Sequence, residues 1–434
     1  MVDRPLRVAM LSVHTCPLAI LGGKKTGGMN VYVRDLSIEL GRRGIQVDIF
    51  TRSQDPCVPH VNDNALGSGI NVIHMPCGPE SPLPTSELFQ HLPEFVSGVA
   101  AFAEQDGVSY DILHSHYWLS GWAALRLREL WDTPIVQMFH TLGRMKDRIT
   151  QETDDREAPV RVEVEHEVMR RADCLIAATP AERTQMMWLY NAAREMIHVV
   201  PPGVDLERFH PIPPTEARQM IGIPPHHRML LFVGRIERLK GIDTLMQAME
   251  ILKRQAPQGL EDLCLTIIGG EPREDPTQED AEMQRLRQLR SDLGVEELVT
   301  FLGARGQNTL QYYYSAAEAV IMPSHYESFG MVALEAMACG TPVIASEVGG
   351  LAYLVQDGVT GFHVPDREPE ELAGKIRLLL ENRALRTEMS QAAVKHAQAY
   401  RWPRIADQIE AVYSDCLAAR RSKNEAVTAL TPHN

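Results

Sequence analysis

Short β-branched runs alternate with helix-length segments along almost the whole chain, and this alternation limits its fold more than any other feature. In the first half the predicted strands are Leu6–Val13, Gln46–Thr51, Asn71–His74, Asp111–His114, Pro134–Phe139, Cys174–Ala178 and Ile197–Val200. In the second half they are Met229–Val233, Leu263–Ile268, Val299–Leu302, Ala319–Met322, Pro342–Ala345 and Gly361–Val364. Such alternation is typical of parallel βαβ units, so we predict an α/β fold class with doubly wound, Rossmann-like sheets.

The intervening helical patterns are clearest at Val31–Arg43, Val160–Arg171, Asp243–Arg254, Met283–Leu293, Phe329–Ala338 and Pro369–Glu381. Between the two series lies a proline-rich passage, from Pro201 to Pro214, which suits a linker because proline resists regular structure. A chain of 434 residues also exceeds one ordinary core. We therefore predict an N-terminal domain over residues 1–205 and a C-terminal domain over residues 206–403. Ligands of such sheets bind beyond the C-terminal ends of the strands.

The charge balance and the cysteines exclude several classes of partner and site. The chain has 57 acidic and 43 basic side chains and a formal net charge of -14, without a strongly basic stripe, which argues against nucleic acid. Its 7 cysteines form no C-x-x-C pair and no cluster with histidine, so we predict no metal site and a reducing, cytoplasmic location. Without a signal-peptide pattern or an apolar run of transmembrane length, no stable membrane insertion is expected.

A glycine-rich loop, Gly22–Asn30, follows the first predicted strand and precedes a helix. Glycines in such a loop let backbone N–H groups approach an anion at the N-terminus of the helix. The loop fits neither G-x-G-x-x-G nor a Walker A pattern, so it supports neither a dinucleotide site nor an ATP site. A purely structural turn and a ligand-binding loop are equally open interpretations.

A second loop, Val233–Gly241, ends the first strand of the C-terminal series and again leads into a helix. Arg235 offers a planar, permanently charged fork and Lys240 a mobile point charge, and both suit a diphosphate. Two solvated surface cations are the alternative interpretation.

A third segment, Pro323–Ala345, runs from the end of a strand through a loop with Glu327 into an apolar helix that we expect to open near Phe329. Glu335 lies about two turns into that helix, where an unpaired buried carboxylate would be costly. A ribose diol would satisfy this carboxylate, and so would a structural salt bridge. The N-terminus of the helix would face phosphate.

Together these segments resemble the retaining family 4 (group 1) glycosyltransferases of GT-B fold. The pattern E-S-F-G-x-x-x-x-E-A-x-A-x-G-x-P-V-I-A from Glu327 is similar to their E-x7-E motif, and G-R-x-x-x-x-K-G from Gly234 agrees with it. The segments G-G-M-N-V-Y-V from Gly27, H-S-H-Y-W-L-S-G from His114 and H-T-L from His140 also match. The similarity spans residues 6 to about 416 and points to inositol-3-phosphate glycosyltransferases of mycothiol synthesis and small bacterial sucrose-phosphate synthases.

The resemblance implies two Rossmann-like domains facing each other across a cleft, with a last helix near residues 404–420 that returns to the first domain. It implies that Arg235 and Lys240 hold the diphosphate of a nucleotide sugar, and that Glu327 contacts hydroxyl groups of its sugar. It also implies that Glu335 binds the ribose. The other donor-site residues implied are His140 beside the sugar, the backbone N–H groups of Phe329, Gly330 and Met331, and Gly28 in a loop that closes over the donor phosphate.

For the acceptor, the resemblance implies binding by Tyr117, Thr141 and Arg161, with Asn30 and Lys25 of the first loop. The alternative role of Arg161 is an i,i+4 ion pair with Glu165. In the segment Gly78–Thr85 this chain departs from the family, because Thr85 stands where those enzymes have a lysine for the acceptor phosphate. Either Lys24 and Lys25 supply that charge, or the acceptor carries no phosphate.

The predicted function is a retaining hexosyltransferase that moves a hexosyl group from UDP-glucose or UDP-N-acetylglucosamine to a small sugar or polyol. Fructose 6-phosphate and inositol 3-phosphate are the phosphorylated acceptors considered. Same-face attack needs no base from the protein, and the two cations replace a metal, so Mg²⁺ is permitted but not required. A transferase for lipid or polysaccharide acceptors is one alternative, and a silent nucleotide-sugar binding module is another. No sequence feature specifies an oligomeric state.

Overall fold

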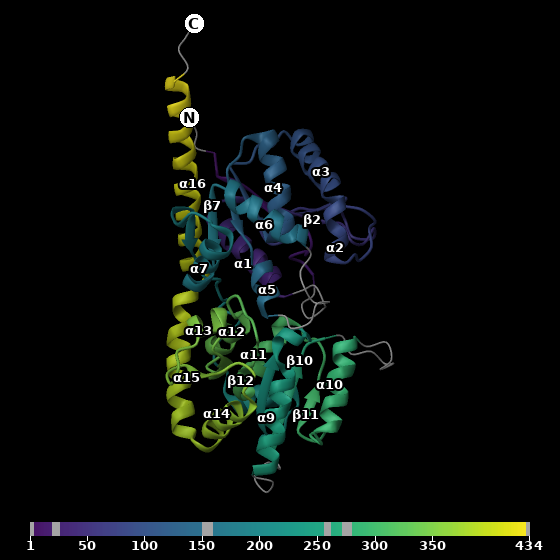
Figure 1. The fold of residues 1–434 in the computed structure, drawn as a ribbon, viewed down its shortest axis with the longest axis vertical. Coiled ribbons are helices and arrows are strands. Elements are labelled where there is room, and N and C mark those ends of the chain that lie inside the picture. Colours follow the sequence, from purple (N-terminus) through teal and green to yellow (C-terminus); the bar gives the residue numbers. More distant parts are fainter. Residues whose placement is uncertain (1–3, 20–26, 150–158, 256–261, 271–279, 431–434) are drawn as a thin grey trace. The chain divides into compact units, whose positions relative to one another are not determined.

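The computed structural model describes residues 4–19, 27–149, 159–255, 262–270 and 280–430, and side chains as far as Arg420 (Figure 1). The chain divides into two compact units. Unit 1 contains the first strand, Met29–Pro201 and the chain from Trp402 onward, and unit 2 contains residues 27–28 and Pro202–Arg401. Each is described by itself below. In the described part of the chain, no helix combines the length and the apolar character that crossing a bilayer requires.

Unit 1 is built on an eight-stranded sheet in the order β3-β4-β2-β1-β5-β6-β7-β8. Its parallel strands are β1 (Arg7–Leu11), β2 (Gln46–Arg52), β4 (Ile70–Met75), β5 (Ile112–His116), β6 (Ile135–Met138), β7 (Cys174–Ala177) and β8 (Ile197–Val199). The seven strands predicted in the first half are all confirmed. The edge strand β3 (Val61–Asn62), antiparallel to β4, was missed because two residues are too few to carry an alternating pattern.

The helices of unit 1 are α1 (Gly28–Arg42), α2 (Thr85–Leu88), α3 (Leu92–Gln105), α4 (Tyr117–Trp131), α5 (Gly143–Ile149), α6 (Pro159–Arg171), α7 (Pro180–Tyr190) and α16 (Trp402–Leu430). Short 3-10 turns lie at η1 (Phe89–His91) and η3 (Arg194–Met196). Helix α16 belongs to this unit although it comes last in the chain. Arg43, just after α1, donates to Asp407 at 2.7 Å and to Glu410 at 2.6 Å, and so attaches α16 to the unit.

Unit 2 is built on a six-stranded, fully parallel sheet in the order β11-β10-β9-β12-β13-β14. The strands are β9 (Arg228–Val233), β10 (Leu263–Ile268), β11 (Val299–Phe301), β12 (Ala317–Met322), β13 (Val343–Ser346) and β14 (Gly361–Val364), so the six predicted strands are confirmed. The helices are α8 (Pro214–Ile221), α9 (Ile242–Gln255), α10 (Ala281–Asp292), α11 (Gln307–Ala316), α12 (Met331–Ala338), α13 (Gly349–Leu354), α14 (Pro369–Glu381) and α15 (Arg383–Ala397). The 3-10 turns are η4 (Arg238–Lys240) and η7 (Gln398–Tyr400).

Burial explains why the central strands have almost continuous apolar sequences. In β9 the side chains of Met229, Leu230 and Leu231 are all fully buried, although successive residues point to opposite faces of the sheet. Both faces of a parallel sheet are covered by helices, so both sets of side chains must be apolar. Helices α9 and α14 pack side by side in unit 2 (Figure 1).

In each sheet the strand order reverses at one place. In unit 1 the reversal lies between the neighbours β1 and β5, and in unit 2 between β9 and β12. Connections at such a point leave in opposite directions, and the space between them is where open α/β sheets bind ligands. The predicted fold class, with two doubly wound Rossmann-like sheets, is therefore confirmed.

Candidate functional site

The loops that follow β9 and β12 bring Lys240 and Glu327 into direct contact in unit 2. Lys240 ends η4, and its Nζ lies 2.5 Å from Oε2 of Glu327. Each side chain is 16% exposed, so the pair is shielded but reachable from solvent. Because β9 and β12 flank the reversal of strand order, the pair lies where this fold binds ligands. An ion pair there offers an ammonium to an anion and a carboxylate to a hydroxyl group.

Backbone contacts hold the two loops together. The N–H of His325 donates to the carbonyl oxygen of Leu239 at 2.9 Å. Gly241 follows Lys240 with a φ of 64°, and a Cβ built on it would lie 2.0 Å from the carbonyl oxygen of Pro323. Only glycine allows both this left-handed conformation and so close an approach. The glycine that ends the G-R-x-x-x-x-K-G pattern is therefore a packing requirement of the site.

The substitution Gly241→Ala is expected to lower kcat/KM by roughly 10²-fold, because the clash separates the loops that carry Lys240 and Glu327. The matched control is Gly222→Ala. Gly222 has a φ of 73°, but a Cβ built on it would meet no atom within 4 Å, so alanine there introduces strain without a clash. Steady-state kinetics on both variants, with thermal unfolding as a check of folding, make the comparison. Equal losses of activity would contradict the role given to loop packing.

A glycine pair that the sequence interpretation missed supports the Glu327 loop. The N–H of Gly350 donates to the carbonyl oxygen of Glu327 at 2.8 Å, and a Cβ on Gly349 would lie 2.1 Å from that oxygen. A Cβ on Gly350 would lie 2.2 Å from Cα of Phe329. The available signal was G-G at the start of a helix just after a strand, a pattern that indicates close approach of another backbone.

Arg235 follows β9 but makes its ion pair elsewhere. Its Nη1 lies 2.6 Å from Oε1 of Glu237, and the two side chains are 38% and 37% exposed. Arg235 is therefore an accessible cation in the same loop as Lys240, and its guanidinium is paired with the carboxylate of Glu237. Exposed pairs of this kind are weak, so a ligand anion would compete for the guanidinium at little cost.

Glu335 is 5% exposed on α12, and the structure places protein partners around it. The hydroxyl of Tyr314 donates to Oε2 at 2.7 Å, and Nε2 of Gln307 donates to Oε1 at 3.4 Å. Burial and the adjacent carboxylate raise the pKa of Tyr314 well above its ordinary value, so the phenol stays a donor. These neutral donors from α11 are partners that neither expected alternative, a ribose or a salt bridge, had named, and a ribose would add to them or replace them.

The helix with Glu335 begins at Met331, two residues later than predicted. Gly330 has a φ of 107°, which is outside the helical region and favours glycine, so the predicted start at Phe329 is wrong. The Phe329 ring is buried, with its centroid 5.9 Å from that of Tyr400. The N–H groups of Phe329, Gly330 and Met331 precede or open the first turn, where backbone donors have no intrahelical partner.

Three residues predicted to bind the acceptor, Tyr117, Thr141 and Arg161, lie together in unit 1. Nη2 of Arg161 donates to the carbonyl oxygen of Thr141 at 2.9 Å and to its hydroxyl at 3.0 Å. Cζ of Arg161 lies 4.9 Å from the centroid of the Tyr117 ring, a cation–π distance. Tyr117 directly follows β5 and Thr141 follows β6, so the cluster borders the strand reversal of this sheet.

Arg161 also makes the ion pair that was its alternative interpretation. Its Nε donates to Oε1 of Glu165 at 2.7 Å, and both side chains are 0% exposed. Glu165 further accepts from the N–H of Gly143 at 3.0 Å and from the hydroxyl of Tyr190. The positive charge of Arg161 is therefore balanced by Glu165 within unit 1, and the pair fixes the segment that follows β6.

His140 lies between β6 and Thr141 in a left-handed conformation, with a φ of 61°. Its Nε2 lies 3.0 Å from Nδ1 of His116, and the Tyr32 ring packs edge-on against it at 5.2 Å. Burial lowers the pKa of His140 to about 3, so the imidazole is neutral at physiological pH. A neutral imidazole beside a donor sugar would contribute a directed hydrogen bond without a charge.

The residues expected from the first loop are only partly described. Gly28 is the first residue of α1, and Asn30 is buried in its first turn, with Nδ2 donating to the carbonyl oxygen of Cys16 at 2.8 Å. Lys24 and Lys25 lie outside the described residues.

Thr85, at the position of the family lysine, is the first residue of α2. The segment before it is held by Arg52, which the sequence interpretation missed. Arg52 is 1% exposed and donates to the carbonyl oxygens of Cys77 at 2.8 Å and Ser81 at 2.7 Å. An arginine at the end of the buried strand β2 was the available signal, because a buried guanidinium must find acceptors.

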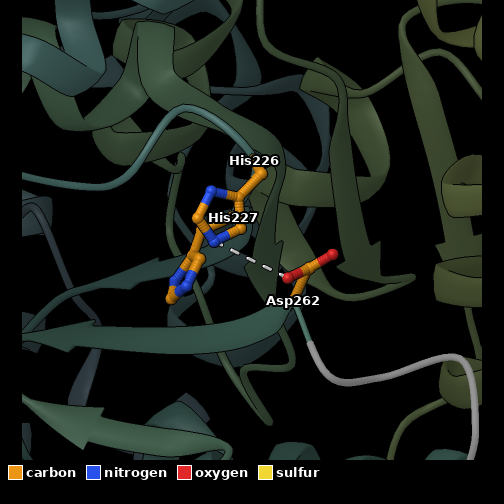
Figure 2. A group of neighbouring side chains, drawn as sticks. All are labelled: His226, His227 and Asp262. Atoms are coloured by element: carbon orange, nitrogen blue, oxygen red, sulfur yellow. Dashed lines mark ion pairs between the residues drawn. The ribbon is translucent and has the colours of Figure 1, made fainter.

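One group among the described residues has the chemistry and spacing of metal ligands: His226, His227 and Asp262 each place a ligand atom within 4.8 Å of the other two. Figure 2 shows the three neighbouring side chains and the ion pair between His226 and Asp262. Nε2 of His226 lies 3.8 Å from Oδ1 of Asp262, and the two side chains are 65% and 54% exposed. The group precedes β9 and β10 and so lies at the N-terminal edge of the sheet. The Lys240 loop follows the opposite, C-terminal edge, so an ion held by this group would not supply charge there.

Comparison with known proteins agrees with this geometry. Residues 214–396 match the family described as "Glycosyl transferases group 1", and residues 26–208 match "Glycosyltransferase Family 4". The chain is 40% identical over 419 residues to a D-inositol 3-phosphate glycosyltransferase of Saccharomonospora viridis, which covers 96% of both chains. It is 41% identical over 419 residues to the corresponding protein of Acidothermus cellulolyticus, which covers 96% of this chain and 92% of the relative.

Among solved structures, a sucrose-phosphate synthase from Thermosynechococcus elongatus superimposes with a TM-score of 0.86 at 36% identity, covering 95% of this chain and 100% of that one. The Anabaena protein HepE in complex with UDP-glucose gives a TM-score of 0.72 at 22% identity, covering 94% of this chain and 100% of that one, and supports the fold alone. The predicted family is thus confirmed. The chain belongs to the group 1, family 4 glycosyltransferases of GT-B fold.

Proposed function

We propose that this glycosyltransferase is a retaining hexosyltransferase that uses a nucleotide sugar and a small sugar or polyol acceptor carrying a phosphate. The observation that carries the proposal is the contact of 2.5 Å between Lys240 and Glu327 at the strand reversal of unit 2. The ammonium suits the diphosphate of a nucleotide sugar and the carboxylate suits the hydroxyl groups of its hexose. UDP-glucose and UDP-N-acetylglucosamine are the proposed donors.

In the proposed reaction the bond between the anomeric carbon and the diphosphate oxygen breaks while the acceptor oxygen bonds to the same face of the sugar. The acceptor proton passes to the departing phosphate oxygen, so no side chain has to act as a base. Lys240 and Arg235 would stabilise the negative charge that develops on the leaving diphosphate. We propose that this charge makes Mg²⁺ dispensable, and activity in EDTA tests that point directly.

The acceptor class is proposed from the cluster around Arg161 and from the relatives. D-Inositol 3-phosphate glycosyltransferase and sucrose-phosphate synthase are names that each point to a phosphorylated small molecule. Arg161 contacts both Thr141 and Tyr117, and the family resemblance implies an acceptor-binding role for all three residues. Because Glu165 balances the charge of Arg161, we propose that Arg161 acts chiefly by positioning Thr141.

The decisive experiment is an activity screen of donors against acceptors. UDP-glucose, UDP-N-acetylglucosamine and GDP-mannose are each offered with inositol 3-phosphate, fructose 6-phosphate and the dephosphorylated forms. Proton coupling at the new anomeric centre in the NMR spectrum of the product reports retention or inversion. No transfer to any of these acceptors, or an inverted product, would contradict the proposal.

A substitution that adds the missing family lysine tests whether the acceptor phosphate lies near α2. Thr85→Lys is expected to lower KM for a phosphorylated acceptor roughly tenfold, because a charge-assisted hydrogen bond is worth about 1.5–3 kcal/mol before desolvation. KM for the dephosphorylated acceptor should not change. Ser86→Lys, on the neighbouring exposed residue, is the matched control. If KM changes equally for the phosphorylated and dephosphorylated acceptors, or equally in Thr85→Lys and Ser86→Lys, the acceptor phosphate does not lie near α2.

A further inference from the structure

We propose that Met10 and His116 fix His140 in the tautomer protonated at Nε2, so that Nδ1 of His140 is left as a hydrogen-bond acceptor. Met10 lies in β1, His116 ends β5 and His140 follows β6, so three adjacent strands supply the three side chains. His116 and Met10 are thus positioning residues, which act on a ligand only through His140.

The two ring nitrogens of His116 have different neighbours. Its Nδ1 lies 3.0 Å from Nε2 of His140, and its Nε2 lies 3.2 Å from Sδ of Met10. A thioether sulfur accepts a hydrogen bond but has no proton to donate. The contact with Met10 is therefore favourable only when Nε2 of His116 carries the proton, because two lone pairs would otherwise face each other.

Both imidazoles are neutral, so each ring carries one N–H. Burial lowers the pKa of His140 to about 3 and that of His116 well below its ordinary value. The ring of His114, itself lowered to a pKa of about 3 by burial, lies with its centroid 4.3 Å from that of His116 and adds to the cost of a charge there. A second proton on either ring is thus excluded at physiological pH.

The positions of the protons on His116 and His140 follow from the contact of His116 with Met10 and from the neutrality of both rings. With its single proton on Nε2, His116 presents a lone pair at Nδ1. The hydrogen bond of 3.0 Å then requires His140 to donate from Nε2. His140 consequently has no proton at Nδ1, which is left as a hydrogen-bond acceptor.

If His140 contacts the donor as proposed, this tautomer decides whether its Nδ1 binds a sugar hydroxyl or a phosphate oxygen. A lone pair at Nδ1 attracts a hydroxyl hydrogen of a sugar and repels the oxygens of a diphosphate, which carry no proton. His140 would then select and orient the hexose. In this tautomer Nδ1 of His140 has no proton to give to the leaving group.

The test is a direct measurement of the tautomer by NMR in the full-length protein labelled with [13C,15N]histidine. Long-range proton–nitrogen correlations separate protonated, pyrrole-type nitrogens from unprotonated, pyridine-type ones, and the signals lost in His140→Asn identify His140. We expect a pyrrole-type Nε2 and a pyridine-type Nδ1. A pyrrole-type Nδ1 would overturn the inference.

Removing the sulfur tests the origin of the preference. Met10→Leu conserves the side-chain volume. It is expected to raise the ratio of the Nδ1-protonated to the Nε2-protonated tautomer of His140 about fivefold, as for the loss of one hydrogen bond. Met186→Leu, at another fully buried methionine of unit 1, is the control and should leave the ratio unchanged. An unchanged ratio in folded Met10→Leu would overturn the role of Met10. If Met10→Leu does not fold, the wild-type spectrum alone decides the tautomer.

The spectra are recorded without substrate, so the inference and the proposed function can fail separately. If the tautomer is the expected one but His140→Ala keeps full transfer activity, the proposed contact of His140 with the donor is wrong. The positioning of His140 by Met10 and His116 would still hold. If the tautomer is the opposite one and His140→Ala loses activity, the inference is overturned. The proposed contact of His140 with the donor would still hold.

Discussion

Lys240→Ala is expected to lower kcat for glycosyl transfer by roughly 10²–10³-fold, the range found when one group that stabilises developing negative charge is removed. The physical reason is that the ammonium, 2.5 Å from Glu327 and 16% exposed, is a partly desolvated charge at the proposed position of the leaving diphosphate. The midpoint of thermal unfolding should fall by no more than about 4 °C, since the pair is partly solvated. Single-turnover kinetics with saturating donor measure the chemical step.

The matched control is Lys253→Ala in the same unit. Lys253 also pairs with a glutamate, Glu297, but the two side chains are 41% and 58% exposed and lie on the outer helix α9 and beyond α10. Its loss should leave kcat within about twofold, as for an ordinary surface pair. Near-normal turnover of Lys240→Ala would remove the proposed donor site. Glu327→Gln separates the two members of the pair, because it keeps the size of the side chain and removes only the charge.

Glu165→Ala is expected to destabilise unit 1 by about 3–5 kcal/mol, because it leaves the fully buried guanidinium of Arg161 without its counter-charge. The substitution also removes the acceptor for the N–H of Gly143 and the hydroxyl of Tyr190. Urea unfolding followed by circular dichroism measures the change in the free energy of unfolding.

The same helix α6 offers an internal control for burial. Arg171 and Glu167 form an ion pair at the same spacing, with Nη1 2.7 Å from Oε1, but they are 28% and 29% exposed. Glu167→Ala should therefore cost only about 0.5 kcal/mol. Similar losses in Glu165→Ala and Glu167→Ala would contradict the importance of burial.

The double variant Arg161→Met with Glu165→Leu separates structure from acceptor binding. Replacing both partners of a buried pair with apolar residues should recover most of the lost stability. If the recovered protein has a raised acceptor KM and an unchanged donor KM, Arg161 or the Thr141 it holds contacts the acceptor. Equal changes in both KM values would mean that the pair is purely structural.

The sequence predicted the strands well because their signal is local. Leu263–Ile268 was predicted at the residues that form β10, since a buried parallel strand is apolar on both faces. The family resemblance of the motifs assigned Lys240 and Glu327 to one donor site, but the ion pair between them was not predicted and is a finding of the structure. The start of α12 was wrong by two residues, because the φ of 107° at Gly330 depends on its packing and not on helix propensity.

The sequence by itself determined the fold class, the strand ends that carry the loops, and the residue types at the proposed donor and acceptor positions. Only the tertiary structure decided which groups satisfy the buried polar atoms: Tyr314 and Gln307 at Glu335, and Glu165 at Arg161. It alone revealed that a methionine sulfur adjoins the His116–His140 hydrogen bond. The reason is that hydrophobic periodicity is written in neighbouring residues, whereas the partner of a buried donor or acceptor comes from whichever distant segment packs against it.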